Sequence, residues 1–118
     1  MSEIPDYTDD EISIIENALR TRWKNEKIKL HPADVEVKMS AYSDVLTDCP
    51  ALFWTHKHCN FIIIKAGENR FRTQFFYEPS DQYGTGRNEY HSLQECVTSV
   101  LQVQADHETL RDGTFQHN

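Results

Sequence analysis

The chain has 118 residues, the length of one ordinary domain. Its 19 acidic and 12 basic residues give a formal net charge of −7, which argues against a protein that binds polyanions with its whole surface. Aromatic residues make up 11% of the chain, more than a disordered segment normally carries. The apolar share of 38% predicts one modest core under a highly polar surface.

The first residues and the cysteines bear on the compartment. The N-terminal stretch has neither a basic segment nor an apolar run, so it predicts no secretory signal. The 3 cysteines form no Cys-x-x-Cys pair, which favours reduced thiols over a disulfide framework and leaves one internal bridge open. The longest apolar runs, 51–54 and 61–64, are far too short to span a bilayer. We therefore expect a soluble, cytoplasmic protein.

A first helix is predicted over residues 8–24. Thr8 can cap its first turn, and Glu11 stands at the position that completes a capping box. Apolar residues recur at helical spacing and form one stripe, made of Ile12, Ile15, Leu19 and Trp23. Residues 1–7 lack any such period and are expected to form a flexible arm.

Strands are predicted between residues 34 and 77, because apolar residues there recur with a period of two. The expected elements are a strand over 34–39, a connection over 43–50, one bulged or two separate strands over 51–56 and 61–65, a hairpin loop over 65–70 and a strand over 70–77. In the hairpin loop, Gly67 or Asn69 can supply a positive φ. The last strand directs Phe71, Thr73, Phe75 and Tyr77 to one side and Arg70, Arg72, Gln74 and Phe76 to the other.

A second helix is predicted from Ser92 to about residue 110, with Ser92 and Glu95 as a capping pair. The polar segment 78–91 before it is expected to be a mobile loop, and residues 113–118 a flexible end. The fold class that follows is an α+β two-layer sandwich, in which an antiparallel sheet of three or four strands carries two helices on one face. The order is α-β-β-β(-β)-α, in a single domain over residues 8–112.

The one cluster with metal-ligating residue types is His56-Lys57-His58-Cys59. On an extended strand, His56 and His58 would point to the same side, and two imidazoles on one side can share a metal ion. A zinc site needs about four ligands, and the sequence does not supply the others at a recognisable spacing. His56 and His58 are therefore weak metal candidates, and we expect no cofactor.

Charge is unevenly distributed along the chain. Residues 20–72 hold ten bases and six acids, whereas residues 1–19 and 73–118 are acidic. Arg70 and Arg72 fall on the strand side opposite the apolar residues, which is the side expected to face water, and Phe76 shares it. Arginine and aromatic residues are favoured at protein interfaces. The predicted binding surface consists of Lys65, Arg70, Arg72, Phe76, Tyr83 and Arg87.

No motif predicts catalysis, and no catalytic residue is assigned. The hypothesis that follows is a non-enzymatic protein-interaction module, such as an adaptor, regulator, inhibitor or chaperone-like subunit. Its partner would be another protein or a second copy of the chain, and it would not bind membranes. Two alternatives stay open, which are nucleic-acid binding through the locally basic sheet and a metal or small-ligand site around His56 and His58.

Overall fold

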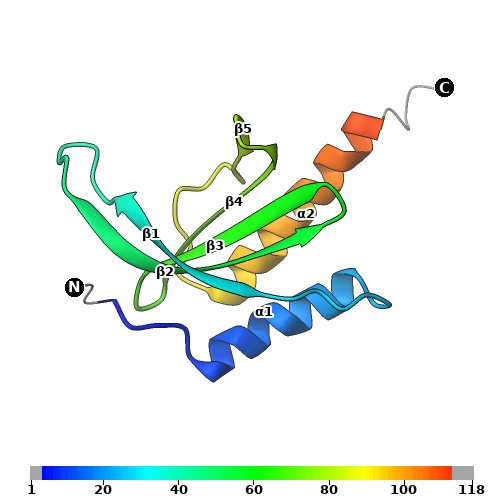
Figure 1. Ribbon diagram of the computed structural model, residues 1–118, viewed down its shortest axis with the longest axis horizontal. Helices are drawn as coiled ribbons and strands as arrows, with labels where there is room; N and C mark the ends of the chain where they lie inside the picture. The colour runs from blue at the N-terminus through cyan, green and yellow to red at the C-terminus, as the bar shows by residue number, and fades with distance from the viewer. Residues whose placement is uncertain (1–3, 113–118) are drawn as a thin grey trace.

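The computed structural model describes residues 4–112, which form two helices and a five-stranded antiparallel sheet (Figure 1). In chain order the elements are α1 (Asp9–Arg22), β1 (His31–Lys38), β2 (Leu46–His56), β3 (Cys59–Gly67), β4 (Arg70–Glu78), β5 (Asp81–Tyr83) and α2 (Leu93–Asp112). Each strand pairs with its neighbour in the chain, so the strand order is β1-β2-β3-β4-β5. The α+β class is confirmed, with five strands in place of the expected three or four. The tail predicted over residues 113–118 lies outside the described residues.

Helix α1 begins where its capping box predicts. The Thr8 hydroxyl accepts a hydrogen bond from the Glu11 amide at 3.1 Å, and a Glu11 carboxylate oxygen accepts one from the Thr8 amide at 2.8 Å. These two bonds satisfy amide groups that the first turn of a helix leaves free. The helix ends at Arg22, two residues earlier than predicted, and Trp23 is its C-cap.

One face of the sheet, the inner face, is buried under both helices. Alternation along the central strands places six large side chains on it, which are Leu52, Trp54, Phe61, Ile63, Phe71 and Phe75. Ile15 and Leu19 of α1 join the same buried cluster, and so do five residues of α2, which are Leu93, Cys96, Val97, Val100 and Leu101. The second helix, predicted from Ser92 to about residue 110, is thereby confirmed as α2.

The segments 51–56 and 61–65, for which the sequence allowed one bulged strand or two separate ones, belong to two strands, β2 and β3. β2 and β3 are joined by a tight turn in which Lys57 has a φ of 56°. In the next hairpin Asn69 also has a φ of 56°, so the predicted positive φ falls on Asn69. The expected connection over 43–50 is wrong in its second half, because β2 already begins at Leu46.

The segment predicted as a mobile loop over 78–91 carries ordered structure. It contains β5, which pairs with the end of β4. Further along, the Tyr90 amide donates to the Phe71 carbonyl at 2.7 Å, and the Phe71 amide donates back to the Tyr90 carbonyl at 2.8 Å. Both ends of the β4 edge are therefore paired, which leaves β1 as the other edge of the sheet.

The sheet curls strongly at its β1–β2 side, where this hairpin extends away from the helices (Figure 1). A side-chain nitrogen of Arg72 on β4 lies 3.4 Å from the carbonyl oxygen of Lys38 at the end of β1. In a flat sheet two strands stand between them and the separation would be about 14 Å. The hairpin therefore bends over the sheet. Cys49 and Ala51, on the β2 strand of the hairpin, and Ala66, on β3, are almost fully buried.

Candidate functional site: the outer face of the sheet

The face of the sheet opposite the helices, here the outer face, is the candidate site. Cross-strand pairs define it, because Phe53 lies opposite Ile62, Ile62 opposite Gln74, and Asn60 opposite Phe76. Neither helix contributes to this side. Its central residues are Phe53, Thr55, Asn60, Ile62, Ile64, Arg72, Gln74 and Phe76.

Apolar side chains on the outer face are only partly covered. Phe53 is 38% exposed, and Ile62, Ile64 and Phe76 are half-buried. Polar residues, among them Thr55, lie beside them, which gives a mixed apolar and polar surface of the kind found at protein interfaces. The sequence prediction placed Phe76 on this side, and the structure does so too.

Arg70 and Arg72, the two predicted basic residues of this face, share one carboxylate, which leaves the three groups with a net charge of +1. Glu89, from the segment before α2, accepts hydrogen bonds from Arg70 at 3.0 and 2.8 Å and from Arg72 at 3.3 Å. The hydrogen bond from Arg70 is the main reason that the pKa of Glu89 lies below its ordinary value of 4.5. The same bond raises the pKa of Arg70. The outer face therefore carries little net positive charge.

We expect Glu89→Gln to lower the free energy of unfolding by about 1 kcal/mol at pH 7, because it removes the ionic part of three charge-assisted hydrogen bonds. The folded-state pKa of Glu89 is lowered, so its contribution is present above the ordinary pKa of 4.5 and is lost as pH falls through the lowered value. Urea unfolding across this range should show the two proteins converging in acid. Glu68→Gln, in an exposed turn, is the control. A constant difference at every pH would contradict the assignment.

Lys65 does not belong to the outer face, so its predicted place beside Arg72 is corrected. It shares the inner face with Phe61 and Ile63, and its side chain is 3% exposed. Its ammonium group lies 2.8 Å from a Glu11 carboxylate oxygen and 3.0 Å from the Asp6 carbonyl oxygen. Burial makes such a pairing obligatory, since an unpaired ammonium group in the interior is costly. Lys65 thus holds the start of α1 against the sheet.

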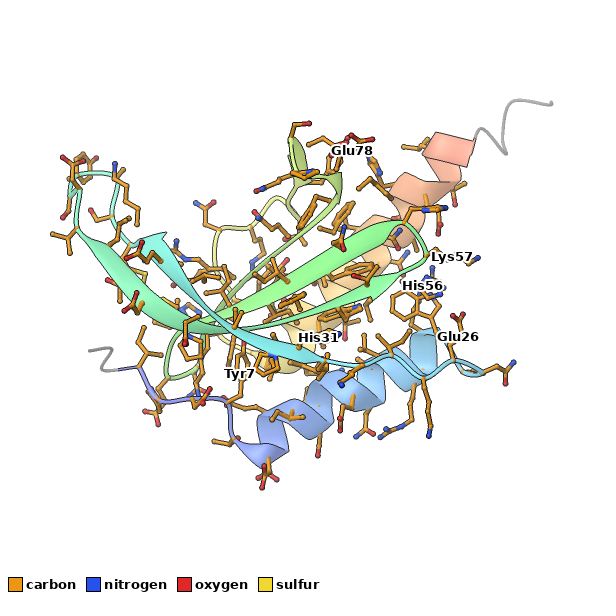
Figure 2. The ribbon with its side chains drawn as sticks, in the orientation of Figure 1. Tyr7, Glu26, His31, His56, Lys57 and Glu78 are labelled. Carbon is orange, nitrogen blue, oxygen red and sulfur yellow. The ribbon has the colours of Figure 1, made fainter. Side chains whose placement is uncertain are left out.

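The segment before α1, expected to be flexible, is also held at this point. The Tyr7 hydroxyl donates to the Ile63 carbonyl at 2.8 Å, and its ring packs near Phe71 with centroids 6.5 Å apart. Burial is the main cause that raises the pKa of Tyr7. The side chain lies between the start of α1 and the sheet (Figure 2).

Tyr83 and Arg87 lie apart from the centre of the outer face. The Tyr83 ring packs on Phe75, with centroids 5.4 Å apart, and on His107 of α2 at 4.3 Å, so it extends the inner-face cluster. A guanidinium nitrogen of Arg87 lies 2.7 Å from a Glu95 carboxylate oxygen, and the guanidinium carbon lies 4.4 Å from the centroid of the Tyr90 ring. The Glu95 amide donates to the Ser92 hydroxyl at 3.2 Å, which caps α2. Of the six predicted residues, Arg70, Arg72 and Phe76 are the ones that β4 brings to one side.

The two histidines proposed as metal candidates do not form a pair on one strand. His56 ends β2, where its ring stacks on Trp23 with centroids 4.1 Å apart and its Nε2 lies 2.9 Å from a Glu26 carboxylate oxygen. His58 is in the exposed β2–β3 turn. Within residues 4–112, no group of three or more His, Cys, Asp or Glu side chains is arranged to hold a metal ion.

The thiols of Cys49 and Cys96 are not activated. Both cysteines are buried, as is Cys59. Burial raises the pKa of Cys96 to about 12 and is also the main cause that raises the pKa of Cys49. Because the thiolate is the reactive form, these two thiols are poor nucleophiles at neutral pH.

Sequence reasoning missed the acidic partners of the basic residues. Glu11 and Glu89 each neutralise a residue that was assigned to the binding surface. For Lys65 a signal was present, because it shares the strand parity of the apolar Phe61 and Ile63 and so belongs to the buried face. For Glu89 no such signal was present in the sequence, since a loop residue has no periodicity from which the direction of its side chain could be predicted.

Similarity to known proteins adds no assignment to this geometry. Over the described residues, neither helix is both long enough and apolar enough to cross a membrane. The chain matches no protein-family model, and neither a curated protein nor a solved structure is significantly similar to it.

Proposed function

We propose that the protein is a non-enzymatic protein-interaction module that uses the outer face of its sheet, and that this face binds a second copy of the chain. The observation that carries the proposal is the partly exposed apolar patch around Phe53 and Ile62, which lies on the side of the sheet that neither helix covers. The three buried thiols fit a reducing, cytoplasmic setting.

Charge favours a second copy as the occupant. A molecule with a net charge of −7 repels its own copies over most of its surface. On the outer face Glu89 compensates one of the two charges of Arg70 and Arg72, so the cluster keeps a net charge of only +1 and two such faces can meet with little repulsion. This compensation also reduces the local positive charge on which nucleic-acid binding through the sheet depends.

The double variant Phe53→Ser, Ile62→Thr is expected to weaken dimerisation at least about tenfold, because it removes an adjacent apolar pair from the centre of the contact. Sedimentation equilibrium should find twice the chain mass for the natural protein and a shift toward the 13.8 kDa monomer for the variant. Leu110→Ser removes a 60%-exposed apolar side chain from α2 and should leave the dimer intact. A natural protein that stays monomeric at its highest soluble concentration would refute the proposal.

A further inference from the structure

The bases among residues 4–110, the range in which the structure describes side chains, fall into two groups. Five of them lie within 4 Å of a carboxylate, and these are Lys38, Lys65, Arg70, Arg72 and Arg87. The other six form no ion pair with any described residue, and we name them the basic end: Arg20, Arg22, Lys24, Lys27, Lys29 and Lys57.

The basic end occupies one end of the molecule. Five of its residues belong to the last turn of α1 and to the connection that leads to β1. Lys57 joins them through its neighbour His56, which stacks on Trp23 and pairs with Glu26 of that connection. Figure 2 shows His56, Lys57 and Glu26 together beside the end of α1.

A surface pocket of about 470 Å³ lies within this group. Four basic residues (Arg20, Lys24, Lys27 and Lys29) and two acidic ones (Glu16 and Glu26) line it, together with the aliphatic Leu19 and Ile28. The residues at the end of α1 have a structural role, because cations are favourable near a helix C-terminus. Lys27, Lys29 and Lys57 lie beyond the last turn, and the helix dipole does not account for them.

The acidic residues of the chain reduce this charge without cancelling it, because four bases and two acids line the pocket and leave a net charge of +2. Asp9 and Asp10 stand at the opposite end of α1, about 18 Å from Arg22 at 1.5 Å per residue. At physiological ionic strength exposed charges are screened over about 8 Å. A ligand at the basic end therefore experiences the local positive charge.

We infer that the basic end binds an acidic protein segment that contributes one aliphatic side chain to the pocket. Charge complementarity selects an anionic partner, and the partly buried Ile28 offers an aliphatic contact to it, with the almost fully buried Leu19 behind. Single-stranded nucleic acid is the less favoured occupant, because it binds by stacking on exposed rings. The ring nearest the pocket, Trp23, is 7% exposed and already contacts His56 on one side and Arg22 at 5.3 Å. This surface is separate from the outer face, so the inference does not depend on dimerisation.

The test is a fluorescence-anisotropy titration of the whole protein with a short labelled peptide of glutamates around one central leucine. Lys27→Gln with Lys29→Gln should weaken binding about tenfold, because two unpaired charges are removed from the rim. Lys38→Gln with Arg87→Gln removes the same charge from ion-paired positions and should change the affinity less than about twofold. Replacing the peptide leucine by serine should weaken binding severalfold.

Three results would overturn the inference. The first is no binding of the peptide at low salt, and the second is an equal loss of affinity in both charge-matched variants. The third is tighter binding of a single-stranded oligothymidylate than of the peptide, which would assign the basic end to nucleic acid. Lys27 and Lys29 lie on the exposed connection after α1, and the side chains of Lys38 and Arg87 are about half exposed. Far-ultraviolet circular dichroism should therefore show an unchanged fold in both double variants.

Discussion

Replacing Glu11 by Gln is expected to lower the free energy of unfolding by about 3 kcal/mol, because the substitution leaves the buried ammonium group of Lys65 without its counter-charge. The Lys65 side chain is 3% exposed and that of Glu11 is 18% exposed, so water cannot replace the lost partner effectively. Glutamine keeps an oxygen that can accept the Thr8 amide, which separates the ion pair from the capping bond. Urea unfolding at neutral pH measures the effect.

Two further variants make this result decisive. Asp10→Asn changes the charge equally in the same helical turn, but Asp10 is exposed and should cost less than about 0.5 kcal/mol. The double variant Glu11→Gln, Lys65→Met removes both charges and should recover much of the loss, because a buried ion pair is often matched by an apolar side chain of similar size. Similar losses in Glu11→Gln and Asp10→Asn would show that the pair contributes nothing.

Phe61→Ala is expected to lower the free energy of unfolding by about 4 kcal/mol, because it opens a cavity in the middle of the aromatic core. Phe61 is fully buried and stacks on Trp54 with centroids 5.1 Å apart and planes 6° apart. Its ring centroid also lies 5.7 Å from that of Trp23 and 6.2 Å from that of Phe75. The two tryptophans make intrinsic fluorescence a direct probe of the unfolding transition.

Phe53→Ala is the matched control for this prediction. It removes the same side chain from the neighbouring strand, but on the outer face, where Phe53 is 38% exposed. Its cost should be about 1 kcal/mol when measured on dilute protein. An equal cost for the two variants would contradict the division of the sheet into a buried inner face and an open outer face.

The sequence was most informative where local chemistry alone decides the structure. The Thr8–Glu11 capping box fixes the start of α1 through two hydrogen bonds within one turn. The turn before β4 depends on a single backbone conformation that Asn69 tolerates. The period of two in β4 places Phe71 and Phe75 on the buried side and Arg72 on the other.

The sequence did not predict the elements that depend on pairing with other strands, which are the start of β2 and the whole of β5. Asp48 and Pro50 made 43–50 look like a connection, but Pro50 lies in β2 before the pairing of β2 with β3, which begins at Ala51. Only one side of β2 is paired there, so a proline is tolerated as on an edge strand. β5 has three residues, which are too few to show a period.

Charge pairing was the least predictable feature of the candidate site. The number of bases in residues 20–72 suggested a basic sheet face, but which bases stay uncompensated depends on contacts between distant segments. Arg70 and Glu89 are 19 residues apart, and Lys65 and Glu11 are 54 apart. The compensated bases lie on the sheet and before α2, and the uncompensated ones surround the end of α1.

The neighbour-to-neighbour strand order has a consequence for chain entropy. Each hairpin of the sheet closes a short loop, whereas α1 and the segment before it reach Ile63 and Lys65 across 54 to 59 residues. Closing a loop of that length costs about 2 kcal/mol more than closing a turn of about four residues, since each doubling adds about 0.6 kcal/mol. The Tyr7 hydroxyl and the Lys65 ammonium group form their hydrogen bonds at the point where this long closure is made, so they offset part of its entropic cost.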